Sequence, residues 1–119
     1  MNEQQKGKEM IEALYGIEFV SNGGNGGYGV VVLETGRILG GDSSFVFVGN
    51  YEVNNGRIIA DVKCTNDRQT LQSIFGDIRE FNLHLEGSTN HDEFLLQGHM
   101  TENPSMQIQV KLTRRAELP

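Results

Sequence analysis

Hydrophobic and polar side chains alternate along most of the chain after residue 15. Residues two positions apart lie on the same face of an extended strand, and such alternation is typical of antiparallel sheets that bury one face. The residues expected to face inward are Ile17, Phe19, Tyr28, Val30, Val32, Phe45, Phe47, Gly49, Tyr51, Val53, Ile58, Ala60, Val62, Cys64, Phe81, Leu83, Leu85, Phe94, Leu96, Gly98, Met100, Met106, Ile108, Val110 and Leu112.

This pattern predicts eight strands, near residues 16–21, 27–34, 37–42, 44–53, 57–65, 79–86, 92–101 and 105–114. Eight sequential antiparallel strands are enough to close an up-and-down β-barrel, which leaves no exposed sheet edge. The alternative is a two-sheet sandwich. A sandwich needs long crossover connections, and the short hairpin loops argue against it.

Short turns predict the strand registers. Asn55 and Gly56 form an Asn-Gly pair, and both residue types tolerate the positive φ angles of a type I′ turn. A further tight turn is expected at residues 34–37, a turn across residues 88–91 and a three-residue loop at residues 102–104. Because opposed residues share a face, the predicted pairs are Val53 with Ile58, Tyr51 with Ala60, Gly49 with Val62, Met100 with Met106, Leu96 with Val110, Phe94 with Leu112, Leu85 with Phe94 and Leu83 with Leu96.

Two segments depart from the alternation. Residues 66–78 read as a helical turn capped by Asp67, whose apolar face should plug one mouth of the sheet or pack beneath it. Residues 1–13 are expected to be a mobile N-terminal segment, and the spacing of Met10, Ile11 and Leu14 indicates a short helix there. The barrel domain should span residues 14–115.

Composition and charge exclude several classes of protein and of binding partner. The 119 residues suit one domain, because two would each have about 60 residues, near the lower limit for independent folding. The net charge of −6 disfavours a nucleic-acid partner and an anionic membrane surface. Cys64 is the single cysteine, so no intramolecular disulfide forms. Neither a long apolar stretch nor a secretory signal is visible, so we expect a cytoplasmic protein.

The sequence holds little candidate chemistry. The glycine-rich residues 22–29 lack the Lys-Ser or Lys-Thr of a phosphate loop, and Asp42 after Gly40-Gly41 reads as a strand corner that accepts backbone N–H bonds. His84 and His99 fall on outward positions, with Leu95 rather than His99 expected opposite His84. We therefore expect no metal site, no cofactor and no enzymatic activity, and a buried, inert Cys64 thiol.

The interior and the exterior offer two candidate binding surfaces. The predicted cavity lining consists of Phe45, Phe47, Tyr51, Phe81 and Phe94. These rings favour a filled core, whereas Gly49 and Gly98 leave gaps that favour a carrier of a small apolar ligand. Outside, an apolar face is expected from Val20, Val31, Leu33, Val46, Val48, Ile59 and Leu95. An exposed apolar face is unusual on a monomer, so we expect a homodimer with Val46 and Val48 near its centre.

Several stretches resemble the GrlR-like family of bacterial negative regulators of type III secretion. They are LYGIEFVSN at residues 14–22, GVVV at 29–32, GRILGGD at 36–42, SIFG at 73–76 and FNLHLEG at 81–87. The resemblance covers roughly residues 14–114. It implies a calycin- or lipocalin-like barrel, often dimeric, whose apolar interior can admit a lipid-like molecule.

The resemblance also implies regulation by protein contact, because the family's namesake sequesters a transcriptional activator. In that protein an acidic surface loop joins the two strands after the Gly-Gly-Asp segment. The corresponding loop here is residues 52–57, and its candidate partner-binding residues are Glu52, Asn54 and Asn55. Only Glu52 among them is acidic.

Overall fold

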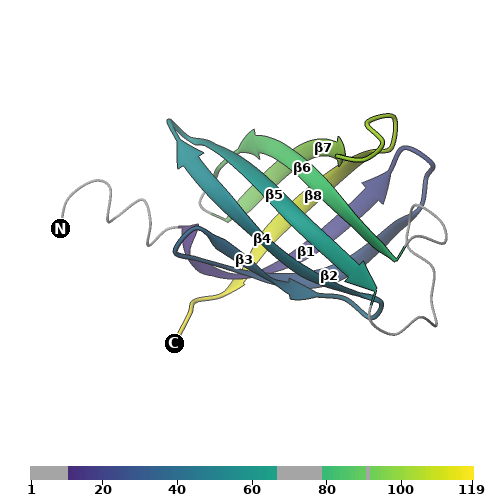
Figure 1. Ribbon diagram of the computed structural model, residues 1–119. Helices are drawn as coiled ribbons and strands as arrows, with labels where there is room; N and C mark the ends of the chain where they lie inside the picture. The colour runs from purple at the N-terminus through teal and green to yellow at the C-terminus, as the bar shows by residue number, and fades with distance from the viewer. Residues whose placement is uncertain (1–10, 67–78, 91) are drawn as a thin grey trace.

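The computed structural model describes residues 11–66, 79–90 and 92–119, which form an antiparallel β-barrel (Figure 1). The strands are β1 (Ala13–Ser21), β2 (Gly26–Glu34), β3 (Arg37–Gly41), β4 (Phe45–Asn54), β5 (Arg57–Asn66), β6 (Glu80–Ser88), β7 (Glu93–Met100) and β8 (Gln107–Ala116). The predicted all-β barrel is confirmed, and the sandwich alternative is wrong.

The barrel closes because β1 pairs with both β2 and β8. Ile17 lies opposite Gly29 on one side and opposite Leu112 on the other. Each of the eight strands therefore has a neighbour on both sides. In Figure 1, the yellow β8 runs beside the purple β1, so the last strand of the described barrel lies next to its first.

The two ends of the barrel differ in what they carry. The start of β1, the end of β8 and the turns at residues 35–36 and 55–56 lie at one end, which we call the terminal end (Figure 1). The turns at residues 22–25, 42–44 and 101–106 lie at the other, which we call the Asp42 end. Strand β5 also ends, and β6 begins, at the Asp42 end.

Most predicted turns and registers are confirmed. Val53 lies opposite Ile58, and Asn55 and Gly56 have φ angles of 55° and 77°. Thr35 and Gly36 form an equivalent tight turn with φ angles of 48° and 77°. The loop between β7 and β8 also has the expected register, as the confirmed pairs Phe94–Leu112 and Leu96–Val110 and the hydrogen bond from Met100 N–H to Met106 O (2.9 Å) demonstrate.

The predicted register between β6 and β7 is wrong by four residues. Leu85 lies opposite Gly98 rather than Phe94, and Leu83 lies opposite Met100 rather than Leu96. The chain leaves the sheet after Ser88, where Thr89 N–H donates to Gly56 O of the β4–β5 turn (2.9 Å). The hairpin loop is therefore wider than a tight turn across residues 88–91.

The predicted inward face of β2 is also wrong. Val31 and Leu33 are buried, whereas Tyr28 and Val30 are 74% and 50% exposed. The cause lies in β1: the inward Phe19 lies opposite Gly27, and a side chain at Gly27 would meet the Phe19 ring at 2.9 Å. Val31 and Leu33 therefore belong to the core and not to the apolar exterior.

The N-terminal boundary differs from the expectation. Strand β1 already begins at Ala13, so Leu14 lies in a strand rather than in a helix. Ala13 and Tyr15 are fully buried and extend the inward alternation backwards from Ile17. Met10 lies outside the described residues. Of the helical turn expected at residues 66–78, Asn66 is the last residue of β5, and the rest lies outside the described residues.

Candidate functional site

The barrel interior contains a partly open cavity of about 220 Å³. All eight strands contribute to its lining, which is mostly apolar and includes Ile17, Val31, Leu33, Ile38, Ile58, Ala60, Val62, Leu83, Leu85, Leu96, Ile108, Val110 and Leu112. An apolar cavity of about 150 Å³ is sufficient for benzene, whereas pockets for drug-sized ligands start near 300 Å³. The cavity thus has room for one small molecule of about ten non-hydrogen atoms.

Packed aromatic side chains fill the barrel near its terminal end. Tyr15 and Phe94 are fully buried, with their ring centroids 5.1 Å apart. The Tyr15 hydroxyl donates to Ile11 O (2.7 Å), and the Arg114 guanidinium lies 5.6 Å from the Tyr15 ring centroid. Neither ring is part of the cavity lining.

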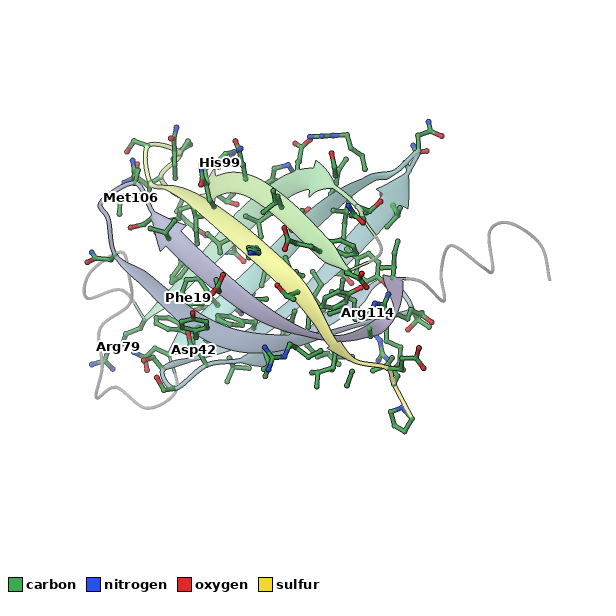
Figure 2. The ribbon with its side chains drawn as sticks, turned by 180° about the vertical axis from the view of Figure 1, so that it is seen from behind. Phe19, Asp42, Arg79, His99, Met106 and Arg114 are labelled. Atoms are coloured by element: carbon green, nitrogen blue, oxygen red, sulfur yellow. The ribbon has the colours of Figure 1, made fainter. Side chains whose placement is uncertain are left out.

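The polar side chains of the cavity lining lie at the Asp42 end. Asp42, Ser43 and Ser44 form the β3–β4 turn and contribute to the lining. Asp42 Oδ1 accepts hydrogen bonds from the backbone N–H groups of Ser44 (2.8 Å) and Phe45 (2.7 Å), which fixes the carboxylate at the corner. This is the corner predicted from the sequence. In Figure 2, the labelled Phe19 and Asp42 lie toward the Asp42 end of the barrel, and Arg114 lies toward the terminal end.

Four phenylalanine rings line the cavity in two contacting pairs. Phe19 and Phe47 meet edge to face with centroids 6.3 Å apart, and Phe45 and Phe81 are 5.4 Å apart. Phe19 is half-buried, whereas the other three are buried. Aromatic walls supply apolar contact area and a negative ring face.

Cys64 also lines the cavity, and its thiol is buried. Burial, together with the smaller effect of the negative charges of Asp42 and Glu102, raises the pKa of the Cys64 thiol to about 12. A thiol with such a pKa is a poor nucleophile at neutral pH, since the reactive form is the thiolate. The expected buried thiol is confirmed.

Only some of the residues predicted to line the cavity do so in the structure. Phe45, Phe47 and Phe81 are in the cavity lining, while Tyr51 and Phe94 pack elsewhere in the core. Sequence reasoning missed the place of Asp42 at the cavity and omitted Ser43 and Ser44. A partial signal was available, since these residues directly precede Phe45, which was expected to face inward.

A second polar cluster lies on the outer face of β5, β6 and β7. His84 Nδ1 lies 2.8 Å from Asp61 Oδ1, and His84 Nε2 lies 2.9 Å from Glu86 Oε2. Carboxylates only accept hydrogen bonds, so His84 makes both of these bonds only in its protonated, imidazolium form, in which each ring nitrogen donates. The hydrogen bonds to Asp61 and then to Glu86 raise the pKa of His84.

His99 joins this cluster, contrary to the sequence expectation. It lies directly opposite His84, with ring centroids 5.9 Å apart, whereas Leu95 was expected there. The four-residue register error accounts for this. Within the described parts of the chain, no three His, Cys, Asp or Glu side chains are placed to hold a metal ion.

The exterior carries the remaining predicted residues. Glu52, Asn54 and Asn55 are exposed near the β4–β5 turn, at the terminal end and so away from the cavity's polar corner. Val46 and Val48 face outward from β4 and are 40% and 49% exposed. They belong to an outer apolar face on β2 to β4 that consists of Tyr28, Val30, Leu39, Val46 and Val48.

Comparison with known proteins finds similarity in structure but not in sequence family. A redesigned beta barrel of known structure is similar, with a TM-score of 0.49, 9% sequence identity, and coverage of 89% of this chain and 92% of that chain. No protein-family model matches the sequence, and no curated protein does. The described residues include no helix that is long and apolar enough to cross a membrane.

Proposed function

We propose that this protein is a non-enzymatic binding protein that holds one small, mostly apolar molecule inside its barrel. The observation that carries the proposal is the cavity of about 220 Å³, with buried apolar walls and polar groups gathered at the Asp42 end. Ligand sites are commonly apolar clefts with a few polar groups that fix orientation. The raised pKa of Cys64 supports binding rather than nucleophilic turnover.

Native mass spectrometry tests this proposal. The protein purified from its own cells should carry a bound small molecule that denaturation releases. Ala60 lines the cavity and is buried, so Ala60→Leu should fill part of the volume and lower the bound fraction. Thr65→Leu is the matched control on the same strand, because Thr65 does not line the cavity. Equal occupancy in wild type and Ala60→Leu would contradict the proposal.

A second candidate function is regulation through a protein partner, and the outer apolar face favours it. Val48 lies opposite Leu39, and Val46 lies opposite Gly41, so the apolar positions on β3 and β4 adjoin. Exposed apolar patches on small proteins commonly mark protein contacts. The resemblance to GrlR-like regulators supports a regulatory protein as the partner, and we propose that the two proteins bind each other in the cytoplasm. It equally supports a homodimer.

Affinity purification at native expression levels tests the regulatory function. A bound regulatory protein should be recovered with wild type and lost with Leu39→Glu, which places a charge within the outer apolar face. Gln109→Glu on β8 is the control, since it adds the same charge at an exposed position away from this face. Recovery of the same partner with both variants would rule out the outer apolar face as the binding surface.

A further inference from the structure

The cavity has an uneven distribution of charge. Asp42 is a carboxylate in its lining, and the hydroxyl-bearing Ser43 and Ser44 lie next to it. Among the described lining residues, none is a lysine or an arginine. Arg79 lies toward the same end in Figure 2 but is exposed and does not line the cavity. A ligand held here thus meets a negative group and no compensating cation from the described walls.

The Asp42 carboxylate has capacity for a further donor. Its Oδ1 accepts the two backbone N–H groups of the turn, and no donor of the described residues contacts Oδ2. A carboxylate has about four lone-pair sites, so two bonds do not saturate it. The two backbone bonds also hold the group in place, which reduces the ordering needed when a ligand binds.

The negative potential extends inward from the corner. The charge of Asp42 is one of the causes that raise the pKa of the buried Cys64, so its field reaches the cavity wall on β5. The rings of Phe19, Phe45 and Phe47 line the same space. Aromatic faces attract cations and repel anions. The carboxylate, the hydroxyls and the ring faces therefore all favour a ligand head group that is cationic and donates hydrogen bonds.

We propose that the cavity selects small amines, with the apolar body inside the barrel and a protonated amino group hydrogen-bonded to Asp42. A fatty acid or other carboxylate of the same size is disfavoured by the like charge of Asp42. This inference rests on the proposed function, because it names the ligand class for the same cavity. The amino group supplies the donors that Oδ2 lacks, and the phenyl-lined interior accepts an aromatic or branched aliphatic body.

A matched series of three ligands tests the inference. 2-Phenylethylamine, 2-phenylethanol and phenylacetate share one ring and a short linker but carry a cationic, neutral or anionic head. We expect the full-length protein to bind the amine about tenfold or more tightly than phenylacetate, with the alcohol between them, by calorimetry at pH 7. The preference should weaken as salt rises, because Asp42 is only partly buried.

Two variants separate the charge of Asp42 from its role in the turn. Asp42→Asn keeps an oxygen that can accept the two backbone bonds but removes the charge, so the amine should lose its advantage over the alcohol. Glu52→Gln changes the net charge equally at the terminal end and should leave the preference unchanged. Far-ultraviolet circular dichroism and melting temperature confirm that both variants are folded.

The outcomes distinguish the two proposals. An amine preference that disappears in Asp42→Asn and persists in Glu52→Gln supports the inference. Equal binding of all three ligands, or tightest binding of phenylacetate, overturns it while the binding function stands. Binding of none of the three, together with no bound molecule by native mass spectrometry, overturns the binding function. An amine preference that survives in Asp42→Asn overturns the assignment to Asp42.

Discussion

At the β4–β5 turn, Asn55 and Gly56 both adopt the left-handed backbone region. A β-branched side chain resists that region, so Gly56→Val should lower the free energy of unfolding by about 1–2 kcal/mol. Urea denaturation measures the change. Asn54→Val is the matched control, since Asn54 is an exposed strand residue that tolerates a β-branched replacement. Equal stability of Gly56→Val and wild type would show that the turn relaxes to another type.

His84 gives the stability of the barrel a pH dependence whose sign follows from its contacts. The hydrogen bonds to Asp61 and Glu86 raise the pKa of His84 above its ordinary 6.5, so its stabilising contribution is complete below that pH and is lost as pH rises through the raised pKa. The pKa of Glu86 is lowered below 4.5, chiefly by its hydrogen bond to His84, so its contribution is lost on acidification.

The stabilising effect of this cluster should be largest between about pH 4.5 and 6.5. Replacement of His84 by Gln should cost the most stability in this window and progressively less at higher pH. Urea denaturation of wild type and variant at pH 5.5, 7 and 9 measures the difference. A difference that grows with rising pH would contradict the raised pKa of His84.

At the scale of the strands, inward glycines allow the backbones of paired strands to approach closely. A side chain on Gly98 would place its Cβ 1.7 Å from the His84 carbonyl oxygen. Gly98→Ala should therefore separate β6 from β7 and destabilise the fold by about 1–3 kcal/mol. Hydrogen exchange should accelerate first in these two strands. Gly23→Ala is the control, because its Cβ would meet only Ser21 Oγ, at an ordinary 3.7 Å.

The alternating pattern was sufficient to predict the eight strands and most of the core, because burial of one face imposes period two. It could not fix the β6–β7 register. A four-residue shift keeps every inward residue opposite an inward residue, so Leu85 can face either Phe94 or Gly98 without exposing the core. The path of the chain after Ser88 decides between them, and it depends on a contact with Gly56.

The face of β2 and the polar corner of the cavity were also beyond the pattern. Residues 30–33 are four consecutive apolar residues, so alternation does not indicate which pair is buried. The Phe19 ring over Gly27 makes that choice, and it is a tertiary contact. Asp42 was recognised as a corner residue, but its access to the interior depends on the closure of the barrel.

At the scale of the whole molecule, the outer apolar face predicts self-association. If two copies pack this face across a two-fold axis, Val48→Glu places like charges near the axis and should yield monomers. Light scattering at high micromolar concentration measures the molar mass. Gln109→Glu, with the same added charge on β8, should leave the dimer intact. A molar mass of one copy for the wild-type protein at that concentration would contradict the predicted homodimer.

Closure by β1 and β8 has a consequence for synthesis. Strand β8, which completes the ring, leaves the ribosome after the other seven barrel strands, so β1 waits for its second partner until residue 116 has emerged. Until then the nascent sheet presents two unpaired borders, at β1 and at the newest strand, and such borders recruit other chains. Premature termination before residue 107 should therefore yield insoluble product rather than a smaller working barrel.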